Sequence, residues 1–240
     1  MDLTSPVFWL ALGQIIWINI ILSGDNAVVI ALAARSLPAH QQKQAIMFGS
    51  GAAVVLRIVL TFVAAALLEL PYLQIIGGLL LLWIGVQLLS QGDDEEGGDV
   101  EDKKADNLFV AVRTILIADL VMSLDNVIAV ALAAKIDGAI NYTLLVLGLA
   151  ISIPLVIFGS TMMIKLMERF PVIIVLGAAL IGWVAGDAIV HDVASEPFVA
   201  GNVWLPYVVK IGCAIFVVVL GKWLAKRPAQ SSAKPPTTPA

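Results

Sequence analysis

Residues 7–34 read VFWLALGQIIWINIILSGDNAVVIALAA, a long apolar run that is interrupted by the polar motif Ser23-Gly24-Asp25-Asn26. A helix needs about 20 mostly apolar residues to cross the hydrocarbon core of a bilayer, and this stretch is long enough. A carboxylate in the middle of such a helix is costly, and by default it indicates function. The stretch therefore predicts a membrane-spanning helix that carries part of a functional site.

The composition of the whole chain agrees with this interpretation. Of its 240 residues, 60% are hydrophobic and 13% are charged, with a mean hydropathy of +0.97 and a formal net charge of −4. Soluble domains carry about 25% charged residues, so the composition argues against a soluble enzyme, a nucleic-acid binder and a disordered protein. The single cysteine, Cys213, excludes an internal disulfide and a cysteine-based metal cluster.

Seven segments are apolar and long enough to cross a membrane: residues 7–34, 45–68, 72–90, 108–134, 142–164, 172–190 and 203–224. Barrel strands are only about ten residues long, so the sequence predicts an all-α membrane protein with seven transmembrane helices. The basic residues of the loops and tail indicate an N-out, C-in orientation by the positive-inside rule. In that orientation Lys135 lies outside, and the inner side holds Arg35, Lys43, Lys103, Lys104, Lys165, Arg169, Lys222, Lys226, Arg227 and Lys234.

The polar motif recurs 100 positions later as Ser123-Leu124-Asp125-Asn126, and the same offset pairs Trp83 with Trp183 and Pro71 with Pro171. Three spans per copy is an odd number, so the second copy is expected upside down. Inverted repeats of this kind are typical of secondary transporters. The predicted organisation is a first three-helix repeat (1–90), an acidic cytoplasmic linker (91–107), an inverted three-helix repeat (108–190), a seventh helix (191–225) and a disordered cytoplasmic tail (226–240).

The two motifs together offer a site made of oxygen atoms. Two aspartates supply negative charge, two asparagines supply neutral oxygens, two serines can add hydroxyls, and Gly24 lets the backbone leave helical geometry. Such a cage suits a hard divalent cation such as Mn²⁺, Mg²⁺ or Ca²⁺, and a polar clamp between helices is the structural alternative. The predicted ligands are Ser23, Asp25, Asn26, Ser123, Asp125 and Asn126.

Two further residues of the fourth span extend this predicted site. Met122 adds a thioether that would favour Mn²⁺ over Mg²⁺ and Ca²⁺, although packing alone also explains a buried methionine. Asp119 lies about two helical turns before Asn126 and corresponds to Asn19 in the first copy. Asp119 and Asn19 are therefore candidates for a second shell of the site or for the next step of an ion path.

Two charged residues of other spans complete the set of candidates. Asp187, in the sixth span, is expected to complete the site or to carry protons. Arg57, in the second span, cannot ligate a cation, so we expect it to neutralise one of the carboxylates when the metal is absent.

The polar motifs resemble those of a known family. Residues 22–27 (LSGDNA) and 118–126 (ADLVMSLDN) are similar to the signature segments of the TerC family of integral membrane proteins, most closely to its short YjbE-like branch. The resemblance runs from the first span to Asp187. It implies manganese export, with intramembrane acidic residues that bind the metal, and it assigns this role to Asp25, Asn26, Asp119, Asp125 and Asn126.

We therefore expect a secondary transporter that exports a divalent cation, foremost Mn²⁺ as the transported substrate, by alternating access coupled to proton entry. We expect no enzymatic activity, a multi-pass location in the cell inner membrane, and the metal ion and the bilayer as partners, without nucleic acid. A homodimer is left open. The alternatives are export of another divalent cation such as Ca²⁺, an intramembrane aspartyl protease that uses Asp25 and Asp125, and a membrane protein that supplies metal to secreted enzymes.

Overall fold

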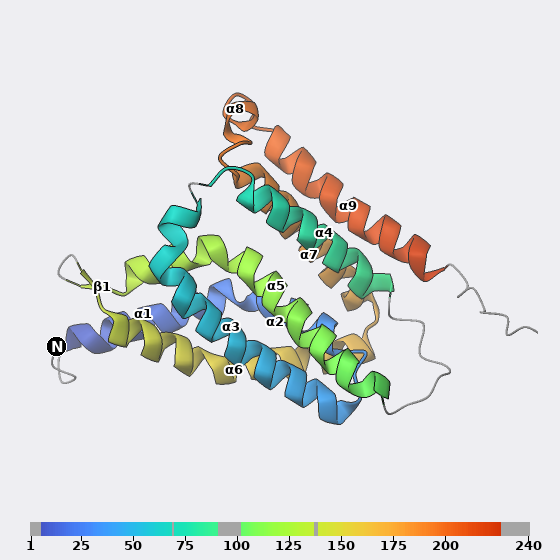
Figure 1. Cartoon of the computed structure of the whole chain (residues 1–240), viewed down its shortest axis with the longest axis horizontal. Coiled ribbons are helices and arrows are strands. Elements are labelled where there is room, and N and C mark those ends of the chain that lie inside the picture. The colour runs from blue at the N-terminus through green and yellow to red at the C-terminus, as the bar shows by residue number, and fades with distance from the viewer. Residues whose placement is uncertain (1–5, 69, 91–101, 137–138, 227–240) are drawn as a thin grey trace, which may run out of the picture.

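The structure, a computed structural model, describes residues 6–68, 70–90, 102–136 and 139–226, and these form helices and one short hairpin (Figure 1). The helices are α1 (Pro6–Leu22), α2 (Gly24–Ala34), α3 (Ala39–Leu68), α4 (Leu73–Ser90), α5 (Asp102–Ala133), α6 (Tyr142–Arg169), α7 (Val172–His191), α8 (Glu196–Val199) and α9 (Leu205–Ala225). The strands β1 (Lys135–Ile136) and β2 (Ala139–Ile140) pair antiparallel, with Lys135 opposite Ile140.

Six helices are each long and apolar enough to cross a membrane, namely α3, α4, α5, α6, α7 and α9. The helices α1 and α2 pass the same test together and are bent by 50° relative to each other. If this pair is counted as one broken span, the total agrees with the seven spans that hydropathy predicts. The helix α5 begins at Asp102, inside the predicted linker 91–107. Residues 91–101 and 227–240 lie outside the described part of the chain.

The first span breaks at Ser23, between α1 and α2. Ser23 has a non-helical backbone, with φ −105° and ψ 2°, and is followed by Gly24, which is about 1 kcal/mol less favourable than alanine inside a helix. The corresponding residue of the second copy is Leu124, a good helix former, and α5 runs through it without interruption. The two similar motifs therefore have different backbones, and the glycine gives the physical reason.

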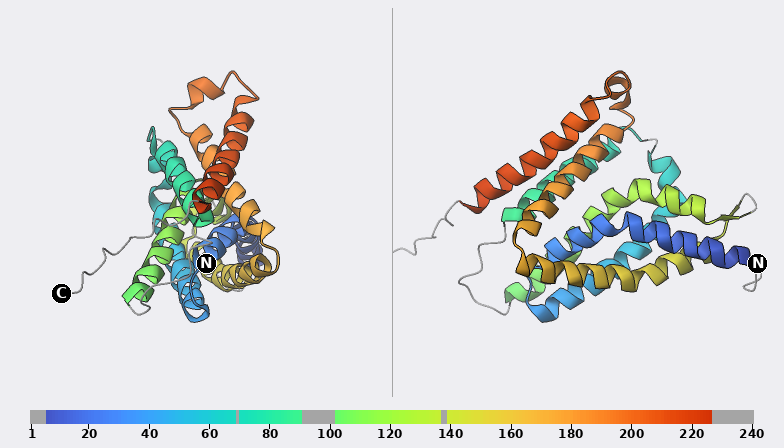
Figure 2. Two further views of the ribbon diagram at one scale, coloured as in Figure 1. Left: turned by 90° about the vertical axis from the view of Figure 1, so that its right-hand side faces the viewer. Right: turned by 180° about the vertical axis from the view of Figure 1, so that it is seen from behind.

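The helices form two groups that pack against each other (Figures 1 and 2). One group consists of α4, α7 and α9, which contact one another, and the other consists of α1, α2, α3, α5 and α6. In the second group α3 packs on α5, and α1 packs on α6. The largest buried cluster joins the groups, because Leu32 of α2, Ile84 of α4 and Ile181 of α7 all belong to it.

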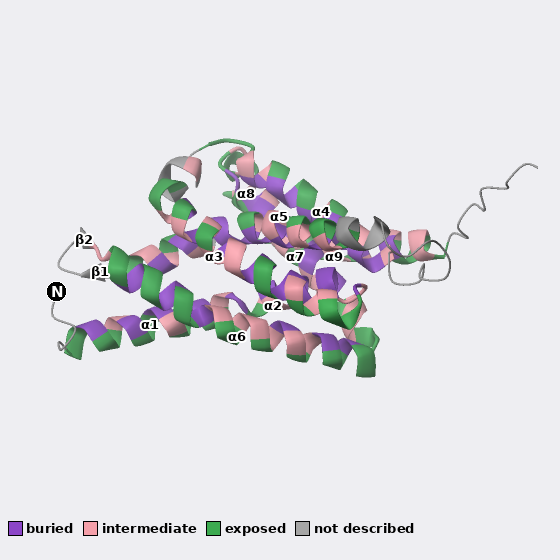
Figure 3. Ribbon diagram, turned by 60° about the horizontal axis from the view of Figure 1, so that its bottom comes forward, coloured by how far each residue is buried: buried purple, intermediate pink, exposed green. Residues whose placement is uncertain are grey.

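Exposed residues lie along the outside of the bundle (Figure 3), and many of them carry large apolar side chains. Trp17 is 64% exposed, Trp83 is 60% exposed and Phe158 is 69% exposed. Soluble proteins rarely expose so much contiguous apolar surface, whereas a lipid bilayer covers it. The fold is that of an integral multi-pass membrane protein.

Candidate functional site

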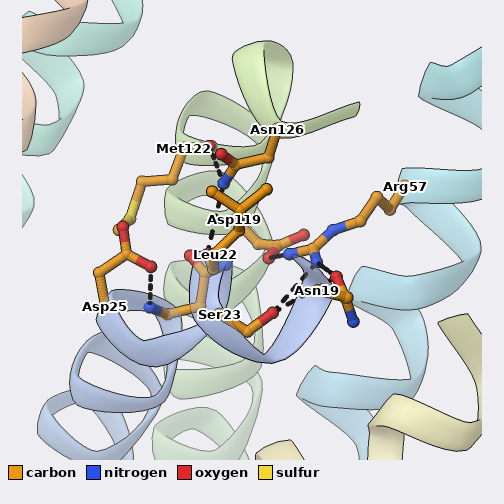
Figure 4. A network of polar contacts seen from close by, with 9 residues as sticks. Asn19, Leu22, Ser23, Asp25, Arg57, Asp119, Met122 and Asn126 are labelled. Atoms are coloured by element: carbon orange, nitrogen blue, oxygen red, sulfur yellow. Dashed lines mark hydrogen bonds and ion pairs between the residues drawn. The ribbon is translucent and has the colours of Figure 1, made fainter. Parts of the chain in front are cut away.

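Arg57, midway along α3, is the centre of a buried polar network (Figure 4). Its Nη2 donates to Asp119 Oδ1 of α5 at 2.6 Å, and both side chains are 5% exposed. Its Nη1 donates to Asn19 Oδ1 of α1 at 2.7 Å and to Ser23 Oγ at 3.4 Å. The hydroxyl of Ser23 also donates to Asn19 Oδ1 at 3.5 Å. One arginine therefore joins three helices inside the membrane domain.

A cavity of about 20 Å³ lies beside this network. About 10–15 Å³ is enough to hold one water molecule, so the cavity has room for a single small occupant such as a water molecule or a bare ion. Helices α1, α2, α3, α5 and α6 all contribute to its wall. Its polar lining consists of Asn19, Ser23, Asn26, Ser50, Arg57, Asp119 and Ser152.

Three oxygen atoms of these lining residues have no hydrogen-bond partner within the described part of the chain. They are Asn26 Oδ1, Ser50 Oγ and Asp119 Oδ2. A buried polar group without a partner costs about 1–3 kcal/mol, and native proteins seldom leave one in this state. An amide, a hydroxyl and a carboxylate oxygen form a donor set that suits a hard divalent cation.

The break in the first span brings the two polar motifs together. Asn126 Nδ2 donates to Met122 O at 2.9 Å and to Leu22 O at 3.4 Å. Leu22 is the last residue of α1, so its carbonyl is one of the groups that a helix end leaves without an intrahelical partner. Asp25 Oδ1 accepts from the backbone N–H of Asn26 at 2.8 Å, and the Met122 side chain points toward the Asp25 carboxylate in Figure 4.

Asp187 does not join this network. Its carboxylate pairs with Lys210 Nζ of α9 and lies 3.4 Å from His191 Nδ1, one turn further along α7. A lysine of the seventh span engages Asp187, so the structure does not bring Asp187 together with the residues around Arg57. Its expected role in carrying protons remains a prediction.

The remaining predicted ligands lie on α5. Ser123 is fully buried, and its Oγ has no partner within the described residues. The backbone of Asp125 is helical, but its side chain lies outside the described part of the structure. Among the described residues, no three Asp, Glu, His or Cys side chains gather into a metal cluster, so a cation would need neutral oxygens in addition to carboxylates.

Two serines of the cavity wall escape prediction from sequence. Ser50 lies in α3 between two glycines, is 2% exposed and matches no polar residue of the second copy. Ser152 of α6 donates its hydroxyl to Gly148 O at 2.7 Å, which leaves its oxygen free to accept. A serine within a long apolar span is a sequence signal for each residue.

Asp192 is a further missed residue, and it lies just beyond α7, outside the spans. Its Oδ1 accepts from Tyr72 N at 2.9 Å and Ala194 N at 2.8 Å, and its Oδ2 accepts from Gln74 N at 3.0 Å and Ile75 N at 3.2 Å. Desolvation alone would raise the pKa of this carboxyl, but the four N–H donors outweigh it and lower the pKa. Asp192 thereby holds the start of α4, where Tyr72 has a φ of 69°, against the end of α7.

The chain matches the model of the integral membrane protein TerC family over residues 4–229. It belongs to the TerC family. The membrane protein YjbE of Bacillus subtilis is 41% identical to this TerC protein over 212 residues, which cover 88% of the chain and 94% of YjbE. The membrane protein YkoY of the same organism is 26% identical over 203 residues, covering 77% of the chain and 63% of YkoY.

A third relative comes from a different bacterium. The inner membrane protein YgdQ of Escherichia coli is 24% identical over 184 residues, which cover 70% of this TerC protein and 75% of YgdQ. No solved structure matches the chain. The family match confirms the resemblance to the TerC family, and this TerC protein is an integral membrane protein.

Proposed function

We propose that this TerC protein is a secondary transporter that exports a divalent metal cation, foremost Mn²⁺, by alternating access. The observation that carries the proposal is the cavity whose lining residues hold three unpaired oxygens, from Asn26, Ser50 and Asp119. Hard divalent cations prefer oxygen ligands. A buried polar cavity of this kind is costly inside a membrane, so its use as a cation site accounts for its presence.

The packing of the helices supports the inverted repeat that such a transporter would use. A two-fold relation between the copies exchanges α1 and α2 with α5, α3 with α6, and α4 with α7, so it exchanges the α3–α5 pair with the α1–α6 pair, and both pairs are in contact. Arg57 binds Asn19 and Asp119, which are equivalent positions. Thr61 and Thr161, also equivalent, each donate at 2.8 Å to the carbonyl four residues before them.

The residues near the break between α1 and α2 can contribute to the selection of the cation and to its release. The carboxylates of Asp25 and Asp119 would supply two negative charges, one of which Arg57 offsets while it holds Asp119. A soft thioether favours Mn²⁺ over Mg²⁺ and Ca²⁺, and Met122 points toward Asp25. The carbonyl at the end of α1, which Asn126 engages, is a group that a small change in the break could turn toward the ion.

Export needs a source of free energy. Moving one charge across 100 mV involves about 2.3 kcal/mol, so a divalent ion that leaves an inside-negative cell works against about 4.6 kcal/mol per 100 mV. The sequence carries no Gly-x-x-x-x-Gly-Lys-Ser/Thr motif for a nucleotide. We therefore propose that proton entry drives export, in the N-out, C-in orientation and in the cell inner membrane.

The protease alternative assigns the chemistry to Asp25 and Asp125, so it gives no role to the buried ion pair between Arg57 and Asp119. A transporter can use such a pair, because the arginine neutralises the carboxylate while the site is empty. No observation in the structure favours Ca²⁺ over Mn²⁺ as the substrate. None favours the supply of metal to other enzymes over export.

Metal accumulation in cells that express the chain under excess Mn²⁺ tests the proposal. Cells with the wild-type chain should hold less manganese than cells with Asp119→Asn at equal protein levels, while their magnesium content stays the same. Equal manganese contents would contradict export. A selective fall in calcium would instead support the alternative substrate.

A further inference from the structure

We propose that the guanidinium of Arg57 competes with the transported cation for the carboxylate of Asp119, and that this competition keeps cation binding weak enough for release. The inference rests on the proposed function and deepens it. Arg57 and Asp119 lie 2.6 Å apart and are both 5% exposed. Both also line the cavity, as do Asn26 and Ser50, the other residues that carry an unpaired oxygen.

The two oxygens of the Asp119 carboxylate are in different states, one bonded to Arg57 and the other open to a metal cation. Oδ1 accepts from Arg57, while Oδ2 has no hydrogen-bond partner within the described residues. A divalent ion in the cavity would draw charge from both oxygens, and a fixed guanidinium beside it would repel the ion. Arginine keeps its charge at every physiological pH. The carboxylate therefore always has a second cation within reach.

The other contacts of Arg57 give it a place to remain when a metal takes over the carboxylate. Its Nη1 is already bonded to Asn19 Oδ1 and Ser23 Oγ. These two groups are neutral acceptors next to the break between α1 and α2. The guanidinium can thus give up its bond to Asp119 without leaving the polar network, and it can return once the metal departs.

Transport requires that a site bind its ion strongly enough to select it but weakly enough to release it. A resident cation that takes back the carboxylate meets the second requirement. Removal of Arg57 should therefore tighten binding and slow turnover, which separates this role from a purely structural one. A structural role predicts weaker binding when the buried pair is broken, because the site would lose its shape.

The experiment measures the affinity of the purified full-length protein in detergent for Mn²⁺ alone, together with Mn²⁺ flux in proteoliposomes. Arg57→Gln should bind Mn²⁺ about tenfold tighter and transport it with a lower maximal rate, whereas Asp119→Asn should bind about tenfold weaker, a factor that corresponds to about 1.4 kcal/mol. The gain from Arg57→Gln should shrink in the Asp119→Asn background. An equal gain in both backgrounds would show through-space repulsion only and would overturn competition for this carboxylate.

Arg57→Lys covers the case in which Arg57→Gln does not fold. A lysine keeps the charge but is a compact point charge without the planar fork, so it cannot hold Asp119 and Asn19 together, and Mn²⁺ should still bind several-fold tighter than in the wild type. Unchanged or weaker binding in the folded variants would overturn the inference. Absence of Mn²⁺ binding in the wild type and in every variant would overturn the proposed function itself.

Discussion

Single atoms distinguish the proposed site from the rest of the apolar interior. Ser50 and Ser160 are both buried serines whose hydroxyls lack a hydrogen-bond partner within the described residues. Ser50 lines the cavity next to Asp119, whereas Ser160 does not. The pair therefore allows a matched test of whether the cavity, rather than burial alone, gives a serine a role in cation binding.

Ser50→Ala should weaken Mn²⁺ binding by about ten- to hundredfold, on the scale of about 1.5–3 kcal/mol for the loss of one polar contact to a charged group. Ser160→Ala, the control, should leave Mn²⁺ affinity unchanged. Titration of the purified proteins with Mn²⁺ measures both. Equal affinities of the two variants would remove Ser50 from the site.

Asp192 should contribute to the loss of stability of the folded protein at acidic pH. Its pKa is lowered in the folded protein, so its carboxylate adds stability above the ordinary pKa, and that contribution is lost as pH falls below about 4 through the folded-state value. Asp192→Asn should lower the free energy of unfolding by about 1–3 kcal/mol at neutral pH and flatten its decline in acid. Thermal unfolding in detergent across pH tests this, with Glu196→Gln, an exposed acid nearby, as the unaffected control.

At the scale of elements, the break between α1 and α2 is the feature that the proposed mechanism needs most. Gly24 and Gly13 both lie in the first span, and a Cβ added at either residue would meet nothing within 4 Å. An alanine side chain therefore fits equally well at both positions. The two positions differ because Gly24 lies beside the break, whereas Gly13 lies within the helix α1.

Gly24→Ala should reduce Mn²⁺ transport by about fivefold without loss of folded protein, because the added helix propensity of about 1 kcal/mol favours a straight span. Gly13→Ala should transport like the wild type. Flux in proteoliposomes at equal protein content gives the comparison. Equal rates for both variants would mean that the break has no part in transport.

The pairing of Asp187 with Lys210 predicts a contrast between two aspartates. Asp187→Asn should leave Mn²⁺ affinity unchanged and lower thermal stability, since it loosens the contact between α7 and α9. Asp119→Asn should instead lose affinity. Binding isotherms and melting curves of the two variants measure this, and a loss of Mn²⁺ binding in Asp187→Asn would return that residue to the site.

The membrane-spanning helices can be predicted from the sequence, whereas parts of the candidate site cannot. Apolar runs of about 20 residues determine spans, and the repeated Asp-Asn motif identifies the region around Asp25 and Asp119. Hydropathy does not state which helices touch, so the pairing of Asp187 with Lys210 and the place of Ser50 in the cavity wall required the three-dimensional packing. Gly24 predicted a flexible backbone, and the structure has a break beside it.

At the scale of the whole molecule, the two helix groups suggest how alternating access could arise. The group of α4, α7 and α9 meets the group that holds the network through mostly apolar contacts, while the cavity lies within the second group. The proposed cation site therefore stays within one group, and relative movement of the two groups could open it to either side of the membrane.

Mn²⁺ flux in proteoliposomes tests the central claim most directly, because purified protein is then the only carrier. The wild-type chain should transport Mn²⁺. An imposed pH gradient should drive Mn²⁺ against its concentration gradient at zero membrane potential. Asp25→Asn and Asp125→Asn should each abolish this flux while folding normally, since both motifs are proposed to serve one site. Full flux in either variant would contradict a shared site, and absence of Mn²⁺ flux in the wild type would contradict the transporter itself.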